Sequence, residues 1–186
     1  WWAPRIPGSW TVVPVRYLAR IRTGSGDTQD AEPDGEYNFY VRSMTVERSG
    51  RWEFQGPAVL TSGDGAGVGK VFHLAHGRFS AHQRVYVLDQ FRSVSPEYFF
   101  YYFSTFFGRV VLAGTAKSTV ESLRRPMVGG LKVTVPPAGE QMEIVKELQA
   151  RSRSYELLTE KARGLVETFR ERRQALISAA VTVQID

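Results

Sequence analysis

The 186-residue chain contains no cysteine and no hydrophobic run of membrane-spanning length. The absence of cysteine excludes disulfide bonds and cysteine-based metal sites, and it fits a protein of a reducing compartment. A bilayer-spanning helix needs ~20 apolar residues in succession, whereas the most apolar stretch, YFFYYFSTFFGRVVLAG, is interrupted by polar residues. No signal-peptide pattern precedes the globular sequence, which opens on Trp1 and is taken to be trimmed at its start. We expect a cytoplasmic protein with no membrane partner.

The sequence also lacks the motifs that carry catalysis. It has no Gly-x-Ser-x-Gly for a nucleophilic serine and no loop typical of a methyl-donor site. His73 and His76 are three residues apart, whereas a helical zinc site needs two histidines four residues apart with a glutamate between them. Pro136-Pro137 lacks the flanking residues with which an amino-methyltransferase grips a flipped base. We therefore expect a non-enzymatic protein that needs no cofactor and no metal ion.

The glycine-rich stretch TSGDGAGVGK (61–70) looks at first like a phosphate-binding loop. A P-loop needs a glycine, four residues, and then Gly-Lys-Ser/Thr, but Asp64 stands at the first glycine position and Val71 at the Ser/Thr position. An acidic side chain in that turn would repel phosphate, and no helix follows to supply a positive dipole end. The stretch is instead predicted to be a hairpin connection between 58–60 and 71–74, with Asp64 bonding its own backbone.

Hydrophobic periodicity predicts short strands and one buried helix. Strands are expected at 37–46, 58–62, 70–74, 84–89 and 131–135. A helix is expected from Pro96 to about Gly114, and its apolar face would carry Tyr98, Phe99, Tyr102, Phe103, Phe106 and Val110. Ser118 and Glu121 form a capping box that predicts a second, short helix over 118–125. Together these elements predict a mixed α/β domain.

The last part of the chain has the pattern of one long helix. Pro136-Pro137 marks its start, so we expect a domain of residues 1–136 followed by a helix over residues 137–186. A helix of ~40 residues is ~60 Å long, which exceeds what a domain of this size could cover. We expect it to pair with another helix as a coiled coil, the alternative being a helix folded back on its own domain. The heptad seam, which Arg151 and Arg172 interrupt, includes Leu148, Tyr155, Leu158, Leu165, Phe169 and Leu176.

The net charge of +5 is unevenly distributed along the chain. A loop between residues 27 and 36 is acidic, and the rest of the domain is basic, which favours a polyanionic partner. Arg and Lys bind phosphates, whereas Arg, Gln and Ser can also read base edges. Any one such residue can be an ordinary solvated side chain. As a group, the following residues predict a surface for double-stranded DNA: Arg42, Lys70, Arg78, His82, Gln83, Arg84, Lys117 and Ser118.

Several short motifs follow one another in a recognisable order. They are IPGSW, RTGSGDT, YNFYVRS, LTSGDGAGVGKVF, FSAHQRVYVL, LAGTAKST, LKVTVPPAGEQMEIVKEL and ERRQALISAAVTVQID. The more specific features are the strand that ends in Pro-Pro, Glu140-Gln141 at the start of the helix and the basic Arg172-Arg173 pair near its end. In this order the motifs resemble one half of the specificity subunit of a type I restriction-modification system. The resemblance covers nearly the whole chain.

This resemblance implies that residues 1–136 form a target recognition domain, which reads one half of a split DNA sequence and catalyses no reaction. It implies that the helix packs antiparallel against a counterpart and docks methylation subunits, with a restriction subunit as a further partner. Such subunits hold two domains and two helices, whereas this chain has one of each. It is therefore either a fragment or a half-length subunit that forms a homodimer on a palindromic split site. The rival hypothesis is a non-enzymatic protein-interaction module whose coiled-coil helix only oligomerises it.

Overall fold

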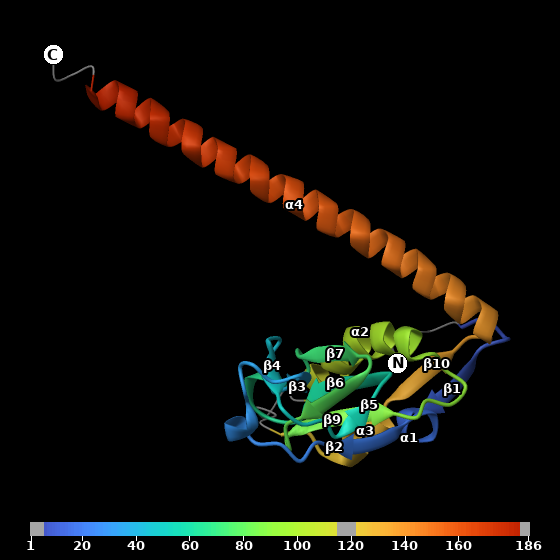
Figure 1. The fold of residues 1–186 in the computed structure, drawn as a ribbon. Helices are drawn as coiled ribbons and strands as arrows, with labels where there is room; N and C mark the ends of the chain where they lie inside the picture. The colour runs from blue at the N-terminus through green and yellow to red at the C-terminus, as the bar shows by residue number, and fades with distance from the viewer. Residues whose placement is uncertain (1–5, 115–121, 183–186) are drawn as a thin grey trace. The chain divides into compact units, whose positions relative to one another are not determined.

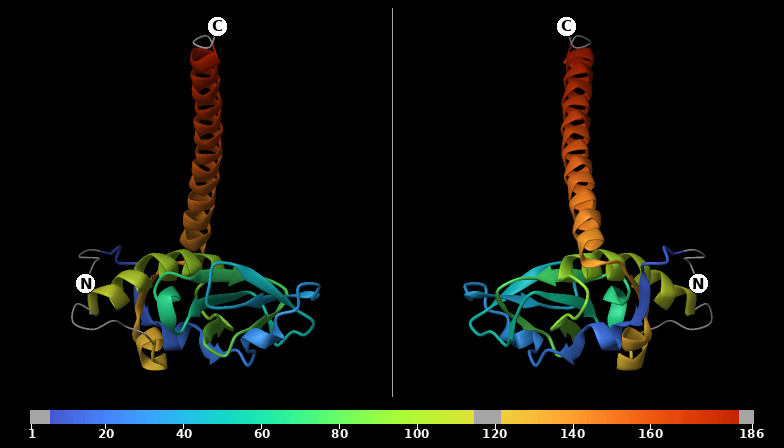
Figure 2. Two further views of the ribbon diagram at one scale, coloured as in Figure 1. Left: turned by 90° about the vertical axis from the view of Figure 1, so that its left-hand side faces the viewer. Right: turned by 90° about the vertical axis from the view of Figure 1, so that its right-hand side faces the viewer.

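The computed structural model describes residues 6–114 and 122–182, in which the strands form three sheets (Figure 1 and Figure 2). The smallest sheet pairs β1 (Thr11–Pro14) antiparallel with β10 (Lys132–Val135). The second is antiparallel, in the order β2 (Arg20–Thr23), β9 (Val85–Asp89), β6 (Ala58–Ser62) and β7 (Phe72–Ala75). The third has the order β4 (Val46–Ser49), β3 (Tyr37–Tyr40), β8 (Arg78–Ala81) and β5 (Phe54–Gln55). In this third sheet β3 and β8 run parallel.

The helices of the described residues range from single turns to one of 45 residues. Two short 3-10 turns lie in loops, η1 (Thr28–Asp30) and η2 (Gly65–Gly67). The α-helices are α1 (Val15–Leu18), α2 (Pro96–Gly114), α3 (Arg125–Gly130) and α4 (Ala138–Thr182). Within this part of the chain, none of the helices is both long enough and apolar enough to cross a membrane.

The hydrophobic core lies between the two four-stranded sheets. In β6, Ala58 and Leu60 belong to this core, as expected for alternate residues that share one face of a strand. Phe79 of β8 stacks on Phe54 with ring centroids 5.4 Å apart, and it meets Tyr40 edge-on at the same distance. The predicted strands at 58–62, 70–74, 84–89 and 131–135 are confirmed within a residue or two of their ends.

Helix α2 packs against the strands β6 and β7 (Figure 1). The rings of Phe99, Phe103 and Phe107 stack along it, with centroids 5.2 and 4.5 Å apart. Phe72 of β7 meets Phe103 edge-on at 5.6 Å. The predicted helix is confirmed, but the placement of Val110 on its buried face is wrong, because Val110 is 49% exposed. The buried face continues along the four-residue spacing through Phe107 instead.

The segment 37–46, predicted as a single strand, is two strands and a turn. The strand β3 ends at Tyr40, and β4 begins at Val46 and pairs antiparallel with it. Within the turn, the Ser43 hydroxyl donates to the Thr45 carbonyl at 3.1 Å. The prediction is wrong because polar side chains can satisfy the backbone of a turn without interrupting an apolar pattern on either side of it.

The predicted helix over 118–125 is wrong in the portion that the structure describes, and its capping box lies outside the described residues. Ser122 forms an isolated antiparallel bridge with Asp64. The Leu123 N–H donates to the Gly63 carbonyl at 2.7 Å. The backbone here is extended because it bonds to a loop that is remote in sequence, and a capping-box pattern contains no information about such a partner.

The start of α4 is anchored to the domain by the buried amide of Gln141. Its Oε1 accepts from the Ser95 N–H at 2.7 Å, and its Nε2 donates to the Pro136 carbonyl at 2.8 Å. Next to it, Trp10 Nε1 donates to a Glu140 carboxylate oxygen at 2.8 Å. The chain divides into two compact units between Met142 and Glu143, so this first turn belongs to the same unit as the sheets.

The glycine-rich connection between β6 and β7 packs directly on α2, which gives a testable consequence for stability. A Cβ at Gly108 would overlap the carbonyl oxygen of Gly69, whose φ of +69° itself favours glycine. We expect Gly108→Ala to lower the free energy of unfolding by ~1–2 kcal/mol, because the overlap costs more than the helix propensity gained. Urea denaturation would measure this loss.

The matched control for this variant is Gly139→Ala in the first turn of α4. Apart from the adjoining residues and the backbone of its own helix, no atom lies within 4 Å of the Cβ that this change would add. We expect it to leave the free energy of unfolding unchanged or slightly raised. Equal stability of the two variants would contradict the close approach of α2 to the loop.

Candidate nucleic-acid interface

The candidate site lies where the parallel strands β3 and β8 end. Tyr40 stands opposite Ala81 in their register, so the residues that follow each strand emerge at the same edge of the sheet. The His82 N–H donates to the Tyr40 carbonyl at 2.9 Å, and the Gln83 N–H donates to the Gly26 carbonyl at 2.7 Å. The structure thereby brings the loop after β3, which carries Arg42, beside the loop that leads from β8 into β9.

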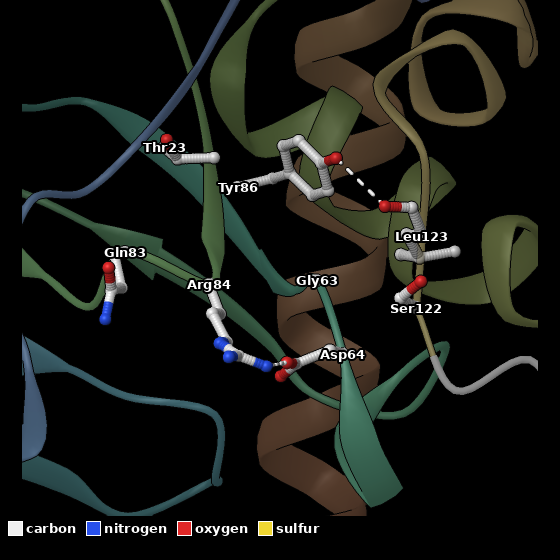
Figure 3. A pocket seen from close by; sticks show the side chains of 8 residues that line it. All are labelled: Thr23, Gly63, Asp64, Gln83, Arg84, Tyr86, Ser122 and Leu123. Carbon is white, nitrogen blue, oxygen red and sulfur yellow. Dashed lines mark hydrogen bonds and ion pairs between the residues drawn. The ribbon is translucent and has the colours of Figure 1, made fainter.

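Asp64 lies at the centre of this edge, between two arginines. Its Oδ1 accepts from Arg42 Nη1 at 3.1 Å, and its Oδ2 accepts from Arg84 Nη1 (Figure 3). The Asp64 side chain is 12% exposed, whereas those of Arg42 and Arg84 are 45% and 61% exposed. The prediction that Asp64 bonds its own backbone is wrong, because its carboxylate bonds these arginines. The turn is held instead by the Ser62 hydroxyl, which donates to the Asp64 carbonyl at 2.8 Å.

The two arginines keep Asp64 ionised. Burial raises the pKa of the Asp64 carboxyl, but the hydrogen bonds from Arg84 and Arg42 and their positive charges outweigh it and hold the pKa below its usual value. A group with a lowered pKa in the folded state stabilises that state above its unfolded pKa, and this contribution is lost as the pH falls through the folded pKa. Both ion pairs are therefore formed at neutral pH.

Two open cavities meet at Asp64. The first, of about 230 Å³, is shown in Figure 3, where Arg84 points toward Asp64 and the Tyr86 hydroxyl donates to the Leu123 carbonyl at 3.0 Å. Its lining is Thr23, Gly63, Asp64, Gln83, Arg84, Tyr86, Ser122 and Leu123. The second, of about 410 Å³, is lined by Thr28, Val41, Arg42, Ser43, Glu47, Asp64, Gly65, Ala66, Gly67 and His82. Arg84 thus borders one cavity and Arg42 the other.

The glycine-rich stretch is a structural connection, as predicted, since β6 and β7 pair antiparallel on either side of it. The Gly63 N–H donates to the Arg84 carbonyl at 2.7 Å, and a Cβ at Gly63 would lie 2.7 Å from that same oxygen. A side chain at this position would therefore push the loop away from β9. Gly65 has a φ of +70°, a conformation that residues with a Cβ rarely adopt. These glycines bring Asp64 close to Arg84.

His82, a predicted DNA-binding residue, is buried. Its ring is 4% exposed, and its Nδ1 accepts from the Arg84 N–H at 3.0 Å. Its Nε2 lies 3.5 Å from an Asp27 carboxylate oxygen. A ring held in this way has little surface left for direct contact with a large ligand, but it fixes the loop that presents Gln83 and Arg84.

The other residues predicted to contact DNA do not all lie at this edge. Lys70 is exposed and lies in the same connection as Asp64. Arg78 is at the start of β8, the end of the strand opposite to the candidate site, with its guanidinium 4.7 Å from the ring centroid of Trp52. The two other predicted contacts, Lys117 and Ser118, lie outside the described residues. The structure therefore gathers Arg42, Gln83 and Arg84 around Asp64, leaves Lys70 in the adjoining connection, and separates Arg78 from them.

The sequence reasoning missed Asp64 and Tyr86 as parts of the site. The partners of Asp64 are 20 and 22 residues away along the chain, and the Tyr86 hydroxyl bonds a carbonyl 37 residues away. The one local signal was an acidic residue inside a glycine-rich loop of a basic domain. In the part of the chain that the structure describes, no cluster of His, Asp and Glu side chains could hold a metal ion.

The helix α4 presents the predicted seam as an apolar stripe. Tyr155, Leu158, Leu165, Phe169 and Leu176 are between 59% and 72% exposed, and Leu148 is partly exposed. Ion pairs spaced three or four residues apart stabilise the helix itself, among them Arg151 with Glu147 at 2.6 Å. In a monomeric protein, an exposed apolar stripe of this length commonly marks a surface for association.

Basic and amide side chains around two cavities, joined to a helix with an exposed apolar stripe, are typical of a nucleic-acid recognition protein that assembles through its helix. Residues 7–165 match the model of a family described as the type I restriction modification DNA specificity domain. The chain belongs to this family. The predicted resemblance and the mixed α/β fold with a long C-terminal helix are confirmed.

Known relatives agree with this assignment. The chain is 25% identical over 183 residues to the type I restriction enzyme EcoDI specificity subunit of Escherichia coli, a match that covers 98% of this chain and 40% of the relative. Its fold is similar to that of the type-I restriction-modification system S subunit from M. genitalium, with a TM-score of 0.66, 16% identity and coverage of 83% of this chain and 42% of that chain. The HsdS subunit from Thermoanaerobacter tengcongensis matches with a TM-score of 0.62, 16% identity and coverage of 82% and 39%. The chain thus spans about 40% of the length of the curated relative.

Proposed function

We propose that this chain reads one half of a bipartite sequence in double-stranded DNA and has no catalytic activity of its own. The observation that carries the proposal is its membership of the DNA specificity domain family over residues 7–165. The domain, proposed to span residues 1–136, presents its DNA-binding surface at the edge where β3 and β8 end. The contacts are supplied by Arg42, Gln83 and Arg84 at this edge and by Lys70 in the adjoining connection between β6 and β7.

The chemistry of these side chains supports two kinds of contact. Lys70 is exposed and carries a point charge suited to a phosphate. Arg84 and Gln83 border a cavity open to solvent, where a guanidinium can bond the O6 and N7 of guanine and an amide can bond the N6 and N7 of adenine. The net charge of +5 favours association with any duplex.

The long helix is proposed to assemble the complex. Its stripe from Leu148 to Leu176 would pack antiparallel against the same stripe of a second copy, which places two identical domains on a palindromic split site. The helix pair would then dock methylation subunits, with a restriction subunit as a further partner. The support for this part is the exposed apolar seam together with the family of the chain.

The salt dependence of DNA binding tests the proposed surface. We expect Lys70→Ala to weaken binding to every duplex and to reduce the slope of log affinity against log salt by about one, because one phosphate contact is lost. Fluorescence anisotropy with a labelled duplex at several salt concentrations would measure both effects.

Lys132→Ala is the matched control. It removes one positive charge, as Lys70→Ala does, but from an exposed position in β10. This strand pairs with β1 in the smallest sheet, which does not carry the candidate site. We expect its slope to equal that of the unmodified chain. Binding that hardly changes with salt in all three proteins would refute the DNA-binding surface and favour a protein-interaction module.

A further inference from the structure

Asp64 places a negative charge in the middle of the surface that we propose binds a polyanion. An ionised carboxylate there repels every nearby phosphate, so its presence lowers the affinity for DNA as such. The role of Asp64 must therefore be something other than attracting DNA. This role rests on the proposed function and concerns how the same surface distinguishes one sequence from another.

The backbone around Asp64 is fixed from several sides. The residue pairs with Ser122 in an isolated bridge, and the neighbouring Gly63 bonds both the Arg84 carbonyl and the Leu123 N–H, each at 2.7 Å. The Ser62 hydroxyl donates to the Asp64 carbonyl at 2.8 Å. A carboxylate on so constrained a turn, with 12% of its side chain exposed, cannot swing out to follow its partners.

Arg42 and Arg84 reach this carboxylate from two different loops and bond its two oxygens separately. Each arginine keeps further N–H donors and a side chain that is 45% or 61% exposed. A free arginine can follow a phosphate in many conformations, whereas a held guanidinium presents its remaining donors in one direction. Because the two arginines border separate cavities, they are placed to contact different positions on a bound duplex.

We propose that Asp64 is the specificity-determining positioning residue of this surface. It holds Arg42 and Arg84 in the geometry that reads base edges, and its charge lowers affinity for every duplex alike. Specificity then arises because only the correct site makes the base contacts that offset this general penalty.

The test compares two duplexes with one variant. The first duplex is the sequence that the unmodified chain selects from a random pool, and the second is a shuffled duplex of the same length and composition. We expect Asp64→Asn to bind the shuffled duplex more tightly and with a steeper salt slope, since released arginines can bind phosphate. We expect its preference for the selected duplex to fall roughly tenfold or more.

Two further variants separate positioning from charge and from folding. Asp34→Asn makes the same change of net charge at an exposed position in the acidic loop, and its preference should remain that of the unmodified chain. Asp64→Glu keeps the charge but displaces the carboxylate, so its preference should fall while its salt slope on the shuffled duplex stays unchanged. Cooperative unfolding on heating shows that a variant is folded. If Asp64→Asn shows no such transition, the comparison is made with Asp64→Glu alone.

The outcomes distinguish this inference from the proposed function. If the unmodified chain selects no sequence at all, the proposed function fails and the inference falls with it. If the unmodified chain selects a sequence and both folded Asp64 variants keep the full preference, the inference alone is overturned. Equal losses on both duplexes would leave the preference intact and would show a merely structural role for Asp64.

Discussion

Replacing Leu158 and Leu165 with aspartate is expected to convert the protein from a dimer into a soluble monomer. Both side chains lie in the apolar stripe of α4 and are 59% and 60% exposed in the single chain. Burying a leucine in a partner interface contributes ~1.5–3 kcal/mol, and each seam position is used twice in a symmetric pair. An aspartate at the same position would bring an unpaired charge into the interface. Light scattering should show a mass near twice 21.0 kDa for the unmodified chain and near 21.0 kDa for the variant.

A neighbouring leucine provides the control for the seam. Leu157 is 53% exposed and lies a third of a helical turn away from Leu158, outside the heptad positions. Leu157→Asp alone should leave the dimer intact, whereas Leu158→Asp alone should weaken it. If the unmodified chain is already monomeric at high concentration, pairing through the helix is refuted.

Phe103→Ala is expected to cause the largest loss of stability of any change considered for the domain. The ring is completely buried, stacks on Phe99 and Phe107, and meets Phe72 of β7 edge-on. Removing a buried phenylalanine costs ~3–5 kcal/mol, which is a large share of the ~5–15 kcal/mol that stabilises a typical domain. Urea denaturation followed by circular dichroism would measure the loss in the free energy of unfolding.

The contrasting variant is Phe106→Ala, on the same helix and of the same residue type. Phe106 is partly exposed, so its removal leaves a smaller cavity and exposes less new surface. We expect its destabilisation to be less than half that of Phe103→Ala. Similar losses for the two variants would contradict the observed orientation of α2 against β7.

The elements that the sequence predicted correctly are those whose signal is local and strong. The strand β6 begins with three apolar residues, α2 has a dense aromatic periodicity, and Pro136-Pro137 precedes a helix with no further proline. Such patterns reflect the burial of one face against the core, whatever the partner. The mixed α/β fold could therefore be anticipated, as could the long C-terminal helix.

The errors arose where the deciding contacts join residues far apart in the sequence. The backbone at Ser122 is extended because it pairs with Asp64, and the strand predicted through 37–46 turns after Tyr40. The burial of the His82 ring against the loop also follows from tertiary packing, which the sequence pattern does not show. The ion pairs of Asp64 depend on the same long-range packing, and no spacing rule relates their members. Local pattern predicts which side chains are candidates for the surface, whereas the contacts among them follow from topology.

The most direct measurement of the central claim is selection of bound duplexes from a random pool by the 186-residue chain, done with and without a methylation subunit. The account predicts that one short sequence is enriched as two inverted copies separated by a spacer of constant length, since two identical domains would be joined by a helix pair of fixed dimensions. The methylation subunit should raise the yield without altering the sequence. A pool that shows no sequence enrichment under either condition would contradict the account.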